Sequence, residues 1–287
     1  MAQSQPHKLG EFIGAFFEDL MKKPVQEFAQ KYSLFFDTNC PRKARGGKKT
    51  LEWTDAHGNK HRLDFVIEKD GTEKSFGEPI AFIELAWRRY TKHSKNKVQE
   101  ISGAVNPICE KYELLKPFKG AILSGDFTDN SLQQLKSEGF HVLYIPSEIM
   151  IKAFSAHDLE IDFEEKSKEI DVKKKFAALK RANKSILEKV REDLLSSCDT
   201  KIKQFIGELE ASYTRKIKTI CILPLHGKRT EVVDVEKAIA FINGYTNIPA
   251  DQKLEYIEVI VTYNNGSIIQ CQFKTKAEAV DFLNKIK

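Results

Sequence analysis

The chain of 287 residues lacks any long apolar run and any recognisable targeting segment. No stretch approaches the roughly 18 consecutive apolar residues that a membrane span requires, so no membrane partner is expected. The N-terminal sequence MAQSQPHK also lacks the basic region followed by an apolar region that marks a signal peptide. These absences predict a cytoplasmic protein.

Cysteine is scarce, with five residues that are odd in number, far apart and never spaced as CxxC. A disulfide framework in a small secreted protein has an even number of cysteines, and structural zinc sites use closely spaced pairs. We therefore expect reduced thiols, with neither a disulfide framework nor a zinc site. The cysteines are Cys40, Cys109, Cys198, Cys221 and Cys271.

A strong excess of charge of one sign is also missing. Lys and Arg number 46 and Asp and Glu number 41, which gives a formal net charge of +5. So small an excess does not by itself indicate a nucleic-acid partner, and local clustering of the basic residues has to decide.

The first part of the chain alternates between helical and strand patterns. Apolar residues at helical spacing over residues 9–32 predict one helix, or two helices broken at Pro24. A basic loop, CPRKARGGKK, follows. Residues 50–71 predict a β-hairpin that turns at residues 57–59, and PIAFIEL at residues 79–85 predicts a third strand.

The next segments predict helical crossovers between buried strands. A helix from about Tyr90 is expected to end before Pro107 or to resume after it. The strand KGAILSGDF, the short helix DNSLQQLKSEG and the strand FHVLYIP follow. Residues 1–157 are therefore predicted to form an α/β domain, a mixed sheet flanked by helices whose later strands are parallel.

The remainder of the chain changes character twice. Residues 158–213 are charged and helical, and they predict either a connector packed on the core or an arm that dimerises or embraces DNA. Their apolar positions keep no strict heptad, which argues against a coiled coil. Residues 214–287 predict a small α+β accessory domain, with a hairpin that turns at residues 264–266, Asn-Asn-Gly.

Two carboxylates in the predicted strands indicate a metal site. Asp64, Val66 and Glu68 share one side of their strand because side chains alternate along it, and Glu84 lies in the next strand. Isolated acids in strands often lie on a solvated face. Two carboxylates on adjacent antiparallel strands repel each other unless a cation neutralises them, and Mg²⁺ prefers carboxylate oxygen. Such a metal suits phosphoryl chemistry.

The order of these residues resembles the PD-(D/E)xK nuclease superfamily over residues 9–150. That resemblance implies a restriction-endonuclease-like fold with a helix that carries a glutamate, an aspartate and then a (D/E)xK element. Glu18, Asp64 and Glu84 match these three positions. It further implies that all three bind Mg²⁺, or Mn²⁺, that Asp64 and Glu84 are catalytic, and that the substrate is double-stranded DNA.

The chain departs from the superfamily pattern at Ala86, where the motif lysine is expected. That lysine normally orients or deprotonates the attacking water. Some members supply an equivalent cation from the following helix, where Lys97 and Lys92 are the catalytic candidates and Arg88 is a third. Two alternatives remain: an active nuclease with a migrated lysine, or a degenerate one that only binds.

Two basic segments are candidates for phosphate contacts. In WRRYTKHSKNKVQE, three cations are spaced i, i+4 and i+7, which predicts a shared helix face. In RKARGGKK, two glycines would let the backbone approach phosphates. A solvated surface is the ordinary alternative for both. The predicted nucleic-acid-binding residues are Arg88, Arg89, Lys92, Lys95, Arg42, Arg45 and Lys48.

The leading hypothesis from the sequence is a Mg²⁺-dependent DNA endonuclease of a type II restriction or phage-defence kind, which could act as a homodimer. A catalytically degenerate nuclease fold that binds nucleic acid or supports assembly is the second hypothesis, and Ala86 is the residue that favours it. A purely structural interaction protein is the third, supported by the charged helical segment 158–213.

Overall fold

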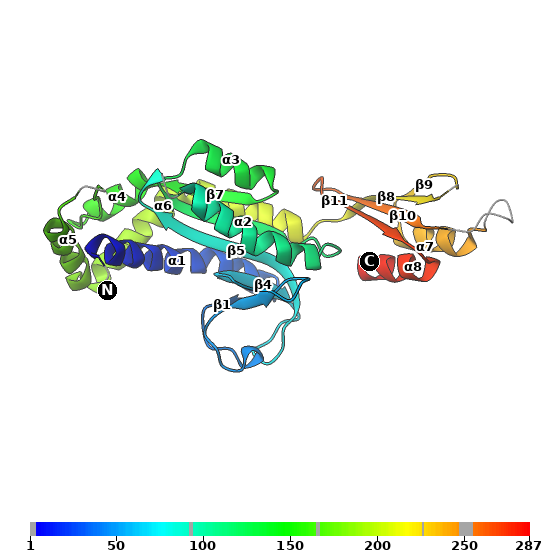
Figure 1. Cartoon of the computed structure of the whole chain (residues 1–287), viewed down its shortest axis with the longest axis horizontal. Coiled ribbons are helices and arrows are strands. Elements are labelled where there is room, and N and C mark those ends of the chain that lie inside the picture. Colours follow the sequence, from blue (N-terminus) through cyan, green and yellow to red (C-terminus); the bar gives the residue numbers. More distant parts are fainter. Residues whose placement is uncertain (1–3, 92–93, 165–166, 226, 247–254) are drawn as a thin grey trace. The chain divides into compact units, whose positions relative to one another are not determined.

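The computed structural model of the chain describes residues 4–91, 94–164, 167–225, 227–246 and 255–287. It divides into two compact units. The first contains the residues up to 111 together with 117–210, and the second contains 112–116 and 211–287. Each unit has its own main sheet, and the colours of Figure 1 follow the chain through both.

The first unit is an α/β domain around a five-stranded mixed sheet, as predicted. The strand order is β1-β4-β5-β6-β7. The first two pairings, β1 with β4 and β4 with β5, are antiparallel, whereas β5, β6 and β7 run parallel to one another, which confirms the prediction for the later strands. The strands are β1 (Phe35–Thr38), β4 (Phe65–Lys69), β5 (Glu78–Arg88), β6 (Phe118–Gly125) and β7 (His141–Pro146).

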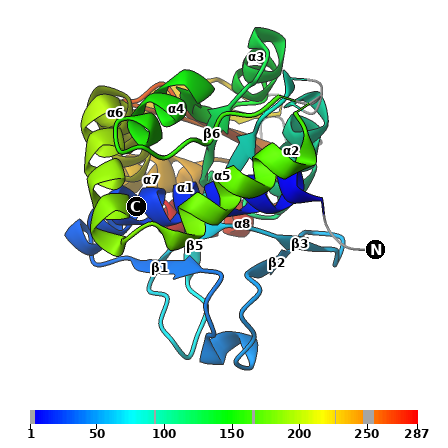
Figure 2. The ribbon, with the colours of Figure 1, turned by 90° about the vertical axis from the view of Figure 1, so that its left-hand side faces the viewer.

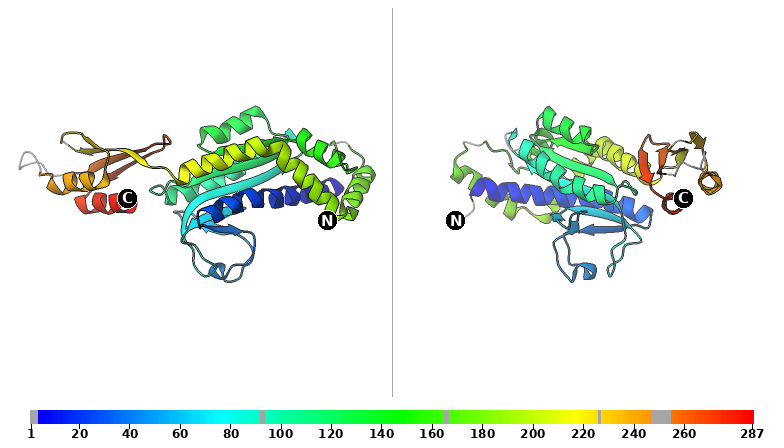
Figure 3. Two further views of the ribbon diagram at one scale, coloured as in Figure 1. Left: turned by 180° about the vertical axis from the view of Figure 1, so that it is seen from behind. Right: turned by 45° about the vertical axis from the view of Figure 1, so that its right-hand side comes forward.

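Helices cover both faces of this sheet (Figure 3). They are α1 (Gln5–Lys31), α2 (Ser94–Lys111), α3 (Asp129–Ser137), α4 (Ser147–Ser155), α5 (Glu169–Arg181) and α6 (Lys184–Tyr213). Successive side chains of β6 point to opposite faces of the sheet and so contact different helices. The ring centroid of Phe118 lies 5.4 Å from that of Phe205 of α6. On the other face, the Lys119 Nζ donates a hydrogen bond to Asn106 Oδ1 of α2 at 3.0 Å. The sheet core therefore lies between an α6 layer and an α2 layer.

Neither proline breaks its helix: the one-helix alternative for residues 9–32 is confirmed, whereas the predicted interruption at Pro107 is wrong. Pro24 lies inside α1, a helix of 27 residues, and Pro107 lies inside α2. Each proline removes one backbone hydrogen bond. Apolar side chains are buried on both sides of it, Met21 and Val25 in α1 and Val105 and Ile108 in α2. Burial of this stripe outweighs the lost hydrogen bond, because tertiary packing supplies most of a helix's stability in a folded protein.

The predicted hairpin of residues 50–71 is divided between two sheets. Its first part forms a separate two-stranded sheet, β2 (Glu52–Thr54) with β3 (Lys60–Arg62), and its last part is β4 of the main sheet. The antiparallel partner of β4 on its outer side is β1, which the sequence did not predict. A strand of only four residues gives almost no periodic signal.

The charged segment is not a separate connector. Helix α5 and residues 184–210 of α6 belong to the first unit, and Figure 2 shows α5 crossing over α1. The rings of Phe12 and Phe176 meet edge to face at 6.3 Å, and Arg191 pairs with Asp19 at 2.8 Å. The boundary predicted at residue 158 is therefore wrong, whereas the prediction that this segment packs on the core is confirmed.

The second unit is a four-stranded antiparallel sheet with two helices. Its strand order is β11-β10-β8-β9. The predicted hairpin joins β10 to β11, and Gly266 of its turn has a φ of +83°, a conformation that glycine adopts without strain. The elements are β8 (Ile217–Pro224), β9 (Thr230–Val232), α7 (Val235–Gly244), β10 (Ile257–Tyr263), β11 (Ile268–Phe273) and α8 (Lys276–Lys285).

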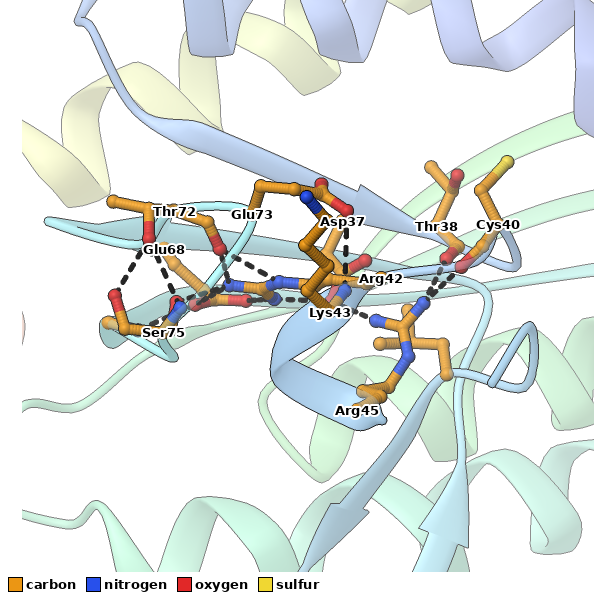
Figure 4. A network of polar contacts seen from close by, with 12 residues as sticks. Asp37, Thr38, Cys40, Arg42, Lys43, Arg45, Glu68, Thr72, Glu73 and Ser75 are labelled. Carbon is orange, nitrogen blue, oxygen red and sulfur yellow. Dashed lines mark hydrogen bonds and ion pairs between the residues drawn. The ribbon is translucent and has the colours of Figure 1, made fainter. Parts of the chain in front are cut away.

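A buried arginine fixes the loops beside β1 and β4 (Figure 4). The side chain of Arg42 is only 2% exposed and pairs with Asp37 and with Glu68, each at 2.5 Å. It also donates to the backbone carbonyls of Thr72 and Ser75, each at 2.7 Å. Arg42 is therefore unavailable to a phosphate, contrary to the prediction, and Glu68 neutralises it instead of facing the predicted acidic site.

Replacing Arg42 with alanine is expected to lower the free energy of unfolding by about 3–5 kcal/mol, because the buried Glu68 would lose its counterion and the buried Asp37 would keep only Arg45. Urea unfolding followed by circular dichroism would measure this. The exposed Lys49 of the same loop provides a matched control, and Lys49→Ala is expected to stay within about 0.5 kcal/mol of the wild type. Equal midpoints for the two variants would contradict a structural role for the arginine.

Candidate active site

Two carboxylates meet where β4 begins beside β5. Asp64 immediately precedes β4, whose Phe65 is paired with Ile83. The backbone N–H of Asp64 donates to Glu84 Oε1 at 3.2 Å, and the N–H of Leu85 donates to Asp64 Oδ2 at 2.8 Å. These reciprocal hydrogen bonds hold both carboxylates at one point of the sheet, and they confirm the predicted antiparallel proximity.

Burial makes the negative charge of this pair unfavourable. Glu84 is 6% exposed, and its burial, with repulsion from Asp64 second, raises its pKa to about 8. Burial also raises the pKa of Asp64. The positive charge of Lys97 acts against burial at both carboxyls by lowering the pKa. The pair is therefore a place where an added cation would be stabilised.

Glu18 of α1 lies near this pair but does not join it. Burial, followed by repulsion from Asp64, raises the pKa of Glu18, and its carboxylate pairs with Lys22 at 3.8 Å. Within the described residues, no three Asp, Glu, His or Cys side chains are grouped so that they could hold a metal ion. The structure thus brings together two of the three predicted ligands, Asp64 and Glu84.

Lys97 of α2 lines the same cavity as Ala86 of β5. Glu84, Ala86 and Arg88 share one side of β5, and the ion pair of Arg88 with Glu100 at 3.9 Å shows that α2 lies on this side. The side chain of Lys97 is 18% exposed. Its ammonium pairs with Glu100 at 3.4 Å, so it is positioned at the cavity wall.

Asp64, Ala86 and Lys97 line a cavity of about 680 Å³ between the N-terminal half of α1 and the end of β5. Asp64, Glu18, Arg88 and Lys97 contribute charge to its wall, and Trp87 and Tyr90 contribute aromatic surface. Carboxylates and cations therefore meet in one space, as the binding of a metal ion and a phosphate requires.

Two glycines of α1 that form part of the cavity wall were not predicted from the sequence. Gly10 and Gly14 lie one helical turn apart on α1 and line the cavity. A Cβ at Gly10 would find nothing within 4 Å, and one at Gly14 would meet only the Cβ of Trp87, at 3.9 Å. Glycine in a helix interior lowers the stability of the helix by about 1 kcal/mol relative to alanine. Two glycines one turn apart on α1 could therefore have indicated a helix face that is kept free of side chains.

The predicted phosphate-binding stripe is not a helix face. Arg88 ends β5, whereas α2 begins at Ser94, so the helical spacing assumed for Arg88, Lys92 and Lys95 does not apply. Lys92 lies outside the described residues. Lys95 is exposed on α2.

Two other predicted phosphate contacts are already neutralised. Arg89 pairs with Asp126 at 2.5 Å and with Asp162. Arg45, 5% exposed at its side chain, pairs with Asp37. Of the predicted loop residues, Lys48 is the one that is exposed.

Binding of Mg²⁺ is expected to release close to one proton at pH 7, because Glu84 is mostly protonated below pH 8 and must ionise to ligate. Affinity should rise as the pH increases from 6.5 to 8.5. Calorimetric titration in two buffers of different ionisation enthalpy measures the released proton. Glu84→Gln should weaken binding and remove the buffer dependence. Identical heats in both buffers for the wild type would remove Glu84 from the site.

Comparisons with known proteins add little to this geometry. No protein-family model matches the chain, and no curated protein matches it. Among solved structures, the crystal structure of a protein of unknown function matches at 14% sequence identity with a TM-score of 0.29, covering 67% of this chain and 97% of its own. None of the helices in the described residues is long and apolar enough to cross a membrane. Similarity at this level establishes neither a shared fold nor a shared activity.

Proposed function

We propose that the chain is a metal-dependent endonuclease that hydrolyses phosphodiester bonds in double-stranded DNA, of the PD-(D/E)xK type and of a restriction or phage-defence kind. The observation that carries this proposal is a carboxylate pair, Asp64 held beside the buried Glu84, next to a cavity that Asp64 and Lys97 line. The order α1-β1-β4-β5-α2-β6 around a mixed sheet agrees with the fold that the sequence resemblance implies.

The two carboxylates fit a divalent cation. In the described residues, Asp64 Oδ1 and Glu84 Oε2 take part in no hydrogen bond, so one oxygen of each is free to ligate. Mg²⁺ is bound by one or two carboxylates with several waters, and Mn²⁺ accepts the same oxygens. When bound, such an ion polarises a phosphate and lowers the pKa of water.

Side chains of the protein would orient the attacking water, bind the phosphate and hold the carboxylates in place. Lys97 reaches the cavity from α2, and its ammonium would orient the attacking water and stabilise the negative charge that develops on it, replacing the lysine absent at Ala86. Arg88 lines the same cavity and would bind a non-bridging phosphate oxygen. Asp64 and Glu84 stay in place because backbone N–H groups hold one oxygen of each.

Supercoiled and linear DNA incubated with Mg²⁺, Mn²⁺ or EDTA would test the proposal. Cleavage that needs metal, is lost in Asp64→Ala and persists in a control at the exposed Glu192, Glu192→Ala, would support it. Binding without cleavage across many substrates would instead support the degenerate nucleic-acid-binding module, which the alanine at position 86 favours. A protein that neither binds nor cuts nucleic acid would refute both.

A further inference from the structure

A basic lobe extends from the first unit beside β1 and β4; it comprises residues 39–63 and 70–77 and includes the buried arginine network of Figure 4. Its lysines Lys43, Lys48, Lys49, Lys60 and Lys74 are exposed. Within the described residues, no ion pair joins any of the five to a carboxylate, so their charge is available to a partner.

The arginine network keeps two nearby carboxylates away from these lysines, although the lobe also carries the exposed acids Asp70 and Glu73. Asp37 and Glu68, two carboxylates beside the lobe, are buried against the guanidinium groups of Arg42 and Arg45. Through Arg42, which donates to the carbonyl of Ser75, the network also ties the two loops of the lobe together. The arginines are therefore structural, and the lysines form the outward surface.

An aromatic ring is exposed among these lysines. Phe76 is 47% exposed, yet two contacts hold its ring in place. Its centroid lies 5.6 Å from the centroid of the Trp53 ring in an edge-to-face arrangement, and 4.9 Å from Cζ of the Arg42 guanidinium. It lines a hollow of about 230 Å³ together with Lys48 and Lys60. A positioned aromatic ring between unpaired cations is the arrangement by which proteins stack bases and bind the adjoining phosphates.

One acidic side chain also lines this hollow. Glu52 faces it, but its carboxylate has a counterion in Arg62, with Nε and Oε1 3.7 Å apart. The charge that the hollow presents to a partner thus remains positive, from Lys48 and Lys60.

We propose that the basic lobe binds single-stranded or unpaired nucleic acid next to the duplex that is cut, with Phe76 stacked on a base and Lys48 and Lys60 on backbone phosphates. The proposal rests on the proposed function and adds a substrate class to it. Base-paired DNA buries both faces of its bases, so only an unpaired base can stack on Phe76.

Fluorescence anisotropy of labelled single-stranded and duplex oligonucleotides, in EDTA and at several KCl concentrations, tests this proposal. Phe76→Ala is expected to weaken single-strand binding by about tenfold or more, whereas Phe76→Tyr, which keeps the ring, should stay within about twofold of the wild type. Lys48→Gln/Lys60→Gln should lower the single-strand salt slope by about 1.4, from two lost phosphates. Lys173→Gln/Lys189→Gln, which removes two exposed charges from α5 and α6, should leave the slope unchanged.

Two outcomes separate this inference from the proposed function. If the wild type binds and cuts DNA but the variants at Phe76, Lys48 and Lys60 bind single strands as it does, the lobe is not the contact surface and the nuclease proposal stands. If the wild type binds no nucleic acid but binds polyglutamate, the lobe recognises an acidic polypeptide, and both proposals are overturned.

Discussion

Replacing Lys97 with alanine is expected to slow DNA cleavage by about two to four orders of magnitude, the usual range for loss of a positioned acid–base group. The ammonium lines the cavity of Asp64 and lowers the pKa of both carboxyls there, so its effect should fall on the chemical step. Single-turnover cleavage at saturating protein measures that step, and anisotropy in EDTA measures affinity, which should change no more than a few fold.

Lys95→Ala is the matched control for Lys97→Ala. Lys95 lies on the same helix, carries the same charge and is exposed. Its removal should weaken binding and lower the salt slope while leaving the cleavage rate at saturation unchanged. If Lys97→Ala and Lys92→Ala both cleave DNA at the wild-type rate, the migrated-lysine mechanism is refuted. Arg88 or the metal ion alone would then have to orient and activate the attacking water.

Glu84→Gln is expected to abolish measurable cleavage and to stabilise the metal-free protein at alkaline pH. In the folded protein the pKa of Glu84 is raised to about 8 from an ordinary value of 4.5, so the folded state holds the proton more tightly than the unfolded state. Stability from this group is complete below pH 4.5 and is lost as the pH rises through 8. The glutamine side chain does not titrate, so at pH 8.5 the free energy of unfolding of Glu84→Gln should exceed that of the wild type by about 2–4 kcal/mol.

Urea unfolding in EDTA at pH 5.5 and pH 8.5 measures this difference. The wild type should lose stability between the two values, Glu84→Gln should lose much less, and saturating Mg²⁺ should restore the wild type at pH 8.5. Glu148→Gln, at an exposed position on α4, should follow the wild type at both values. A pH dependence that is the same in Glu84→Gln and the wild type would show that the buried charge does not limit stability.

The sequence located the carboxylate pair because strand periodicity and strand order are local signals. Asp64, which immediately precedes β4, lies beside Glu84 of the antiparallel neighbour β5 as predicted, and Lys97, one of two lysines chosen, lines the cavity of Asp64. Four residues of β1 gave no such signal, because a short strand next to a long helix has too few residues to show a period.

Charge clusters in the sequence were less informative than strands. Arg42 and Arg89 both lie in basic runs, yet each is paired with acids that are distant along the chain, Glu68 and Asp162 among them. Which acid neutralises a given arginine depends on tertiary packing. Local clusters of basic residues therefore predicted too many phosphate contacts, and they did not reveal the structural role of the buried guanidinium of Arg42.

Relocating the lysine tests the central claim most directly, because Ala86 and Lys97 line one cavity beside the same two carboxylates. The measurement is the single-turnover rate of DNA cleavage in Mg²⁺ for the wild type, Lys97→Ala and the double variant Lys97→Ala/Ala86→Lys. We predict that the single variant is slower than the wild type by at least about a hundredfold and that the double variant recovers at least about tenfold of that loss. A single variant that cuts like the wild type, or a double variant as slow as the single one, would contradict the account.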